Sequence, residues 1–111
     1  MKLSDVKGER VFDVIADIID PITVIAMDEE SARLFHRDPC PEGVQPWQFF
    51  LQKVKRSLPT LVRTHRKELV SILSTIKGVS PEEYVENLTF ASLFADLTEL
   101  VTDSEFVSFF G

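Results

Sequence analysis

Apolar residues recur along most of this chain at spacings of three and four, which is the period of an α-helix with one apolar face. Acidic side chains at Asp13, Asp17 and Asp20 fall mostly elsewhere on the first such helix and predict a solvated face there. The apolar positions of this segment are Val11, Phe12, Ile15, Ile18, Ile19 and Ile22. No segment alternates apolar and polar residues between turn signals, so we predict no β-strand.

Two helices are predicted in the first third of the chain. The first begins within residues 5–7, with Ser4 as its cap. It is kinked or restarted at Pro21, because proline has no amide hydrogen and crowds the preceding turn. A shorter helix is predicted over residues 28–36, with Asp28 as its N-cap.

A proline-rich loop is predicted over residues 37–46, which contain three prolines and a glycine. Pro46 suits the first position of the next helix, because the amide hydrogen that proline lacks has no helical partner there. We expect Pro59 to interrupt that helix. Its predicted apolar face consists of Trp47, Phe50, Leu51, Val54 and Leu58.

The next helix is expected to end at Gly78, a residue type that favours the left-handed conformation of a helix C-terminus. Ser80 and Glu83 then have the spacing of a capping box and predict a new helix start. We expect this helix to continue through Leu100. The apolar positions before Gly78 are Leu69, Ile72, Leu73 and Ile76.

A second capping box, formed by Thr102 and Glu105, predicts a terminal helix. Its aromatic residues Phe106, Phe109 and Phe110 are three and four positions apart, so we expect them to share one stripe. Two interpretations stay open. The stripe either closes the core, or it is exposed and binds an amphipathic helix or a neighbouring subunit.

Together these elements predict one all-α domain over residues 1–111, folded as a single irregular bundle of about five to seven short helices. The length is that of one domain, and the frequent prolines disfavour a regular up-and-down bundle. The predicted core consists of Phe12, Ile15, Ile19, Phe50, Leu51, Val54, Leu69, Leu73, Leu88, Leu97 and Leu100.

Charge is distributed unevenly along this acidic chain, whose net charge is −6. Residues 1–52 carry −5 and residues 68–111 carry −7, whereas residues 53–67 carry +6 and no acid. We call the six cations of that segment the basic band: Lys53, Lys55, Arg56, Arg63, Arg66 and Lys67.

The basic band is interpreted as a docking surface for an acidic protein or for the acidic face of another copy, which would give a weak homo-oligomer. A run of cations also attracts phosphate, so a nucleic-acid-binding function is an alternative. We do not expect it, because the isoelectric point is about 4.8 and no helix-turn-helix pattern is evident.

The chain contains few residues that suggest a catalytic or metal site. Cys40 is the only cysteine, and the two histidines, His36 and His65, are interpreted as surface residues. We therefore predict no catalytic site, no metal site and no cofactor, and a protein that acts by binding other proteins. No apolar run approaches the roughly 20 residues of a membrane span, and no signal peptide is evident, so a cytoplasmic location is expected.

Three segments of the chain carry a family resemblance: Met1–Ala16, Gly78–Tyr84 and Thr102–Val107. In order and spacing they resemble tail assembly chaperones of bacteriophages with long, flexible, non-contractile tails and of prophages in Gram-positive bacteria. The resemblance extends over most of the chain and is least secure in the proline-rich loop. It provides no compact site motif, so it assigns no binding residue.

The resemblance implies a small helical protein that binds the very long, helical tape measure protein. Such a chaperone keeps its client soluble while tail tube subunits polymerise around it, and is absent from the mature virion. The tail tube protein is a further partner that this function implies. Two alternatives stay open: a small phage DNA-binding or regulatory protein, favoured by the basic band, and a structural head–tail component, favoured by the size of the chain.

Overall fold

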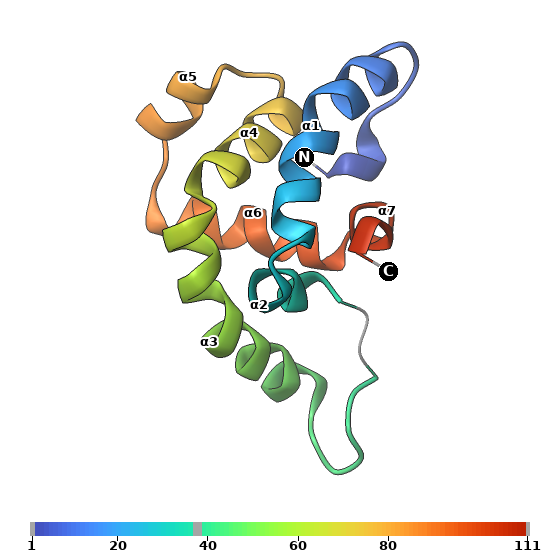
Figure 1. Ribbon diagram of the computed structural model, residues 1–111, viewed down its shortest axis with the longest axis vertical. Helices are drawn as coiled ribbons and strands as arrows, with labels where there is room; N and C mark the ends of the chain where they lie inside the picture. The colour runs from blue at the N-terminus through green and yellow to red at the C-terminus, as the bar shows by residue number, and fades with distance from the viewer. Residues whose placement is uncertain (1, 37–38, 111) are drawn as a thin grey trace.

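The structure is a computed structural model that describes residues 2–36 and 39–110 (Figure 1). The described residues form helices and turns without strands, which confirms the predicted all-α, irregular bundle of short helices. Positions 37 and 38 of the predicted loop lie outside the described residues, and positions 39–45 form no helix. The elements in chain order are η1 (Leu3–Asp5), α1 (Arg10–Ala26), α2 (Glu29–Ala32), η2 (Arg33–Phe35), α3 (Pro46–Thr64), α4 (Arg66–Lys77), α5 (Pro81–Glu86), α6 (Phe90–Thr102), α7 (Ser104–Val107) and η3 (Ser108–Phe110), where η marks a 3-10 turn.

Helices α1 and α4 pack side by side in the middle of the bundle, and α6 runs across it (Figure 1). Helix α2 packs against α3, and α5 packs against α4. The two chain ends meet where η1 packs against α7, and the backbone amide of Ser4 donates a hydrogen bond of 3.0 Å to Oδ2 of Asp103. The terminal segments therefore form one side of the molecule together with α1.

The first turn of α1 is fastened to the last turn of α4. The guanidinium of Arg10 donates to the carbonyl oxygens of Thr75 and Ile76 at 3.0 and 2.9 Å. Carbonyls at a helix C-terminus have no partner within the helix, and a cation complements their partial negative charge. Gly78 ends α4 in the left-handed conformation, as predicted, with φ of +75°.

The prediction that Pro59 interrupts its helix is wrong, since α3 runs through it, and α1 likewise continues through Pro21 without a restart. Each proline removes one hydrogen bond, to the carbonyl four residues earlier, at Asp17 and at Lys55. Both of these residues are exposed, so water can satisfy the carbonyl that is left without its helical partner. The prediction of a helix start within residues 5–7 is also wrong, because Gly8 adopts the left-handed conformation and α1 begins after it.

The helix predicted to run from Ser80 through Leu100 is two helices, α5 and α6. Ser80 caps α5 as predicted, since its hydroxyl accepts a hydrogen bond of 3.1 Å from the amide of Glu83. A cap that the sequence reasoning missed starts α6: the hydroxyl of Thr89 accepts from the amide of Ser92 at 3.1 Å. Thr89 and Ser92 are three residues apart, a spacing that could have predicted this helix start from the sequence.

The last helix start is capped by Asp103 and not by Thr102. The carboxylate of Asp103 accepts from the amide of Glu105 at 3.0 Å, whereas the hydroxyl of Thr102 donates back to the carbonyl of Thr98 at 2.9 Å. Thr102 is thus the last residue of α6. Aspartate is among the strongest N-cap residues, which explains why α7 starts one position later than the capping box predicted.

The buried face of α1 differs from the predicted one. Of the predicted core residues, Phe12, Ile15 and Ile19 are exposed to 76%, 48% and 42%, and Leu51 of α3 is exposed to 47%. Val54 and Leu88 are partly buried and pack against the core, Phe50 is partly buried, and the remaining four predicted positions are buried. The residues of α1 that enter the core are Val14, Ile18, Ile22 and Ile25.

Helix α1 carries apolar residues on two adjacent faces, and this explains the error. At about 100° per residue, Ile15 and Ile19 lie roughly 100° around the helix from Val14 and Ile18. Spacing alone cannot say which face the rest of the chain covers. Packing against α4 buries the Val14 face and leaves the Phe12 face in solvent.

Candidate protein-binding surfaces

A groove lies between α1 and the two chain ends, with a volume of about 230 Å³. Its residues come from η1, the first half of α1 and the last residues of the chain. Glu105 and Ser108 supply its only polar side chains among the described residues. We call it the α1 groove, and its lining consists of Leu3, Val6, Val11, Val14, Ile15, Glu105, Ser108 and Phe109.

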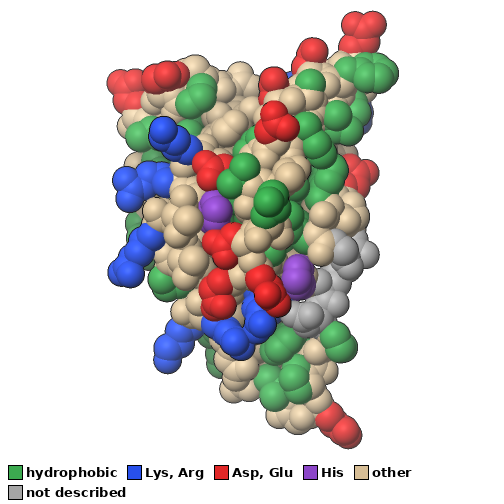
Figure 2. Space-filling view, viewed as in Figure 1, with side chains coloured by type: hydrophobic (Ala, Val, Ile, Leu, Met, Phe, Trp, Pro, Cys, Tyr) green, Lys and Arg blue, Asp and Glu red, His purple; other side chains and the backbone are tan. Residues whose placement is uncertain are grey.

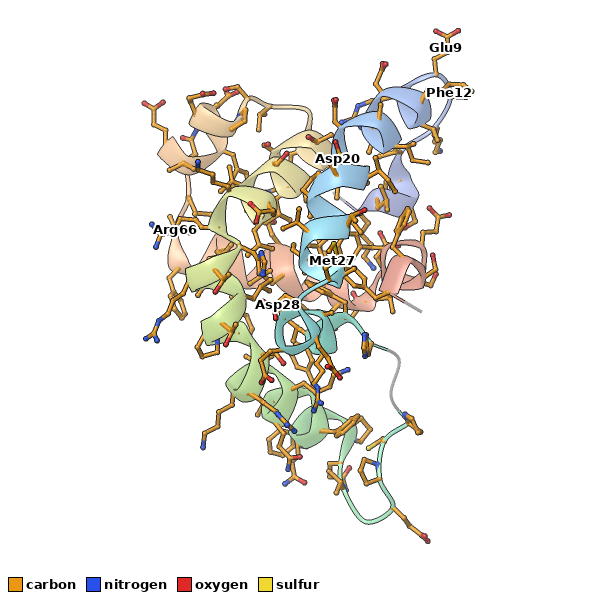
Figure 3. All side chains as sticks on the ribbon, in the orientation of Figure 1. Glu9, Phe12, Asp20, Met27, Asp28 and Arg66 are labelled. Carbon is orange, nitrogen blue, oxygen red and sulfur yellow. The ribbon has the colours of Figure 1, made fainter. Side chains whose placement is uncertain are left out.

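The exposed face of α1 extends this groove along the surface. Phe12 and Ile19 project from the same helix beside Ile15, and Figure 2 shows hydrophobic side chains exposed over α1. The carboxylates of Asp13, Asp17 and Asp20 are exposed along the next face. Phe12 and Glu9 both point outward at the start of the helix, as Figure 3 shows. Helix α1 thus presents an apolar stripe bordered by acids.

The predicted aromatic stripe is divided by the structure. Phe106 and Phe110 belong to an aromatic cluster with Phe35, whose ring centroid lies 5.2 Å from that of Phe106 and 4.9 Å from that of Phe110. Phe106 is fully buried, whereas Phe109 is 37% exposed and lines the α1 groove. Positions 106 and 110 share a face because they are four residues apart, and position 109 points to the side. Phe109 alone of the three therefore lies at a candidate binding surface.

Two cations of the basic band are held by neighbouring parts of the chain. The Nζ of Lys53 donates to the carbonyl of His36 at 2.6 Å, and Arg56 forms an exposed ion pair of 3.7 Å with Glu30. The Arg56–Glu30 pair thus brings the acidic N-terminal segment against the basic band. An exposed pair of this kind contributes little to stability.

The other four cations form no ion pair with any described residue and are exposed: Lys55, Arg63, Arg66 and Lys67. Lys55 lies in the middle of α3, Arg63 in its last turn, and Arg66 and Lys67 at the start of α4 (Figure 2). Arg66 projects away from the bundle (Figure 3). This part of the basic band is free to meet an anionic partner.

A second groove, of about 190 Å³, lies beside these cations. It is formed where the end of α3, α4, α5 and the start of α6 meet. Arg63 and Arg66 stand at its rim, and among the described residues no acidic side chain lines it. We call it the basic-rimmed groove. Its apolar floor includes Val70, Leu73, Leu88 and Leu93.

A buried polar network supports one wall of the basic-rimmed groove. The carboxylate of Asp96 is buried in α6 and accepts from the hydroxyl of Tyr84 at 2.7 Å and from Nζ of Lys77 at 3.0 Å. Burial, together with the adjacent Asp96 carboxylate, raises the pKa of the Tyr84 phenol well above its usual range. The network joins α5 to α4 and α6.

His65 is buried, contrary to the prediction of a surface role. Its Nε2 lies 2.7 Å from Oδ2 of Asp28, and its Nδ1 lies 3.1 Å from Oε1 of Glu68. Burial opposes the charged imidazole, but the hydrogen bonds to both carboxylates outweigh it and raise the pKa of His65. Glu68 follows His65 by three residues, so its contact with the imidazole could have been predicted from the sequence. Asp28 is distant in sequence, so its contact could not.

Cys40 and the carboxylates are the remaining residues that could carry chemistry. The thiol of Cys40 is exposed and lies 3.2 Å from the carbonyl oxygen of Val44. Within residues 2–36 and 39–110, no three histidine, cysteine, aspartate or glutamate side chains are grouped closely enough to hold a metal ion. In the same ranges, every helix is too short or too polar to cross a lipid bilayer.

Comparisons of this chain with models of protein families, with characterised proteins and with solved structures give no match. The chain thus presents two candidate surfaces: an apolar groove with an acidic border on α1, and a basic-rimmed groove formed by the end of α3, α4, α5 and the start of α6.

Proposed function

We propose that this protein is a chaperone that binds an amphipathic helical client in the α1 groove. The sequence resemblance to phage tail assembly chaperones supports a phage tape measure protein as that client. The observation that carries the proposal is the exposed apolar face of α1, which continues the groove along the surface.

The exposed apolar residues of α1 suit a helix-in-groove interaction. Such grooves accept apolar side chains at positions i, i+3 or i+4, and i+7 of the bound helix. Val11, Phe12, Ile15 and Ile19 are all at least 38% exposed on one helix, and Phe109 adds an aromatic side chain at the groove. Clustered exposed apolar side chains mark interaction sites more often than isolated ones do.

The acidic border of the stripe suits a chaperone. A long apolar helical client aggregates unless its apolar face is covered. Once α1 covers that face, the carboxylates of Asp13, Asp17 and Asp20 remain at the surface of the complex. Their like charges keep neighbouring complexes apart in solution.

Coexpression with a phage tape measure protein tests the proposal, with client solubility and copurification as the readouts. The variant carries Ile15→Ser and Phe109→Ser, both in the α1 groove. The matched control carries Val24→Ser and Phe90→Ser, which remove the same kinds of exposed side chain outside the groove; Val24 is 45% and Phe90 88% exposed.

We expect the groove variant to lose most of the client binding, because aromatic and aliphatic anchors dominate such interfaces, while the control retains it. Thermal melts of both variants establish that they fold. If the client is equally soluble with and without this protein, and no complex is recovered, the chaperone function is wrong. If both variants bind equally well, the client is held elsewhere.

A DNA-binding or regulatory function is the second candidate, and the four exposed cations of the basic band favour it. Lys55, Arg63, Arg66 and Lys67 would then contact phosphates, and binding would weaken steeply with salt. A gel-shift titration on duplex DNA at several salt concentrations distinguishes the candidates. Binding of DNA without any effect on client solubility would favour this second function.

A further inference from the structure

We infer that the basic-rimmed groove is a docking site for an acidic amphipathic helix of a partner protein. This inference goes beyond the proposed function, because that function uses the α1 groove and assigns no role to this one. The two sites share no lining residue.

The apolar floor of the groove sets the first requirement for the occupant. Val70 and Leu73 of α4 face Leu88 and Leu93 across the groove, and Leu88 and Leu93 are only partly buried by the bundle itself. Covering apolar area contributes about 25 cal/mol per Å², so an occupant with an apolar face gains affinity here. A helix supplies such a face at a width that a groove between helices accepts.

The rim sets the second requirement, which is negative charge. Arg63 lies in the last turn of α3 and Arg66 begins α4, and both guanidiniums are exposed without an ion pair to any described residue. With no acid among the described lining residues, nothing within the groove neutralises them. Guanidinium binds carboxylates in a bidentate geometry, so glutamates or aspartates that border the partner's apolar face would complete the interface.

The groove exists before any partner binds. The Tyr84 hydroxyl and Lys77 ammonium both bond to the buried Asp96 carboxylate and fix the position of α5 relative to α4 and α6. A preformed groove avoids the entropy cost of ordering its walls on binding. The fixed shape of the groove therefore favours its use as a specific docking site.

Nucleic acid fits the groove less well than an acidic helix. Phosphates would be attracted to Arg63 and Arg66, but the sugar–phosphate backbone offers no extended apolar face for Leu88 and Leu93. The acidic, apolar face of α1 in a second copy shares the chemistry of the inferred occupant. Both alternatives are outcomes of the following experiment.

The probe is a fluorescently labelled, designed helical peptide with leucines at positions i, i+4 and i+7 and glutamates on both sides of them. A second peptide has lysines in place of the glutamates, and a short duplex DNA is the third probe. Binding is measured by fluorescence anisotropy at low and moderate salt. Amide chemical shifts in NMR spectra locate the bound peptide.

We expect the acidic peptide to bind more tightly than the lysine peptide and to weaken with salt. The shifted amides should include Val70, Leu88 and Leu93. The variant Arg63→Glu with Arg66→Glu should weaken binding by about tenfold or more, since it reverses two rim charges. The matched variant Lys55→Glu with Lys67→Glu changes the same net charge outside the groove and should change binding much less.

Equal binding of the two peptides, or an equal effect of both charge-reversal variants, would overturn the inference. So would peptide shifts confined to the α1 groove, or DNA that binds tightly and displaces the peptide. Sedimentation of the protein alone tests whether a second copy of this chain occupies the groove. An oligomer that the acidic peptide cannot dissociate, but that Arg63→Glu with Arg66→Glu abolishes, would show that the occupant is a second copy and not a partner protein. The Ile15→Ser and Phe109→Ser variant should bind the acidic peptide normally, so failure of this inference leaves the proposed function unaffected.

Discussion

The Nε2 atom of His65 lies 2.7 Å from Oδ2 of Asp28, so an ion pair joins the start of α2 to the junction of α3 and α4. Glu68 contacts the other ring nitrogen at 3.1 Å. Both nitrogens face carboxylates, and only the protonated ring can donate to both. The imidazolium therefore fastens α2 to the bend between α3 and α4 (Figure 1).

This ion pair predicts a dependence of stability on pH. The pKa of His65 is raised in the folded protein, so its stabilising effect is complete below its ordinary value of 6.5 and is lost as pH rises through the raised value. The hydrogen bond from His65 lowers the pKa of Asp28, so the Asp28 contribution is present above its ordinary value of 3.8 and is lost as pH falls through the lowered value. The contribution of this ion pair to stability should therefore be greatest between pH 3.8 and pH 6.5.

The test compares His65→Gln with the wild type in urea denaturation at several pH values. We expect the substitution to reduce the free energy of unfolding by about 1–3 kcal/mol at pH values below 6.5, because it removes hydrogen bonds between charged groups. The difference should shrink as pH rises through the raised pKa. A difference that is constant across this range would show that His65 is neutral in the fold.

Truncation at two positions tests which residues form the core: Leu73 of α4, which is buried, and Phe12 of α1, which is exposed. Leu73→Ala should reduce the free energy of unfolding by about 2–5 kcal/mol, because Leu73 is only 4% exposed. Phe12→Ala should change it by less than about 0.5 kcal/mol, because Phe12 is 76% exposed. Denaturant melts of both variants measure the effect. A large cost for Phe12→Ala would mean that the predicted core face of α1 was right after all.

The cap of α5 can be tested in isolation. Ser80→Ala should cost about 0.5–2 kcal/mol, because the amide of Glu83 loses its acceptor. Hydrogen exchange of that amide is the direct measurement and should accelerate. Ser80→Asp is the control, because aspartate also caps helices and should keep the exchange slow. Unchanged exchange in the alanine variant would contradict the cap.

The Tyr84–Asp96 hydrogen bond should be both stabilising and visible by spectroscopy. Tyr84→Phe removes a donor to a buried carboxylate and should cost about 1–3 kcal/mol. Tyr84 is the only tyrosine, so absorbance reports its ionisation alone. Because the pKa of the folded phenol is raised, phenolate should appear only as the protein unfolds at high pH. Ionisation of the folded protein near the ordinary value of 10 would contradict the burial of this group.

Self-association follows from the alternating charge blocks and is tested by a charge swap. We expect a weak oligomer in low-salt sedimentation, in which Lys55 and Lys67, which lie outside the basic-rimmed groove, meet the acidic face of α1 in another copy. Lys55→Glu with Lys67→Glu should lower the apparent mass, and so should Asp17→Lys with Asp20→Lys. A mixture of the two variants should restore association. A wild-type protein that is monomeric at high concentration and low salt would exclude the oligomer.

The sequence alone determined the features that depend on neighbouring residues. The all-α class follows from helical periodicity, and the cap at Ser80 and the helix end at Gly78 follow from local backbone chemistry. Where two local signals competed, the prediction from the sequence was wrong. Thr102 and Asp103 both suit an N-cap, and Pro59 is tolerated because it sits on the exposed side of α3.

Only the tertiary structure decided which surfaces are buried. Helix α1 has two apolar faces, and the choice between them depends on α4, which no periodicity within α1 can encode. Phe106 and Phe109 look equivalent in sequence, but Phe35 packs on one and leaves the other at the α1 groove. Burial and charge pairing are relations between segments that lie far apart in the chain. Local patterns therefore predicted the helices of this protein, and the packing of those helices determined its candidate binding sites.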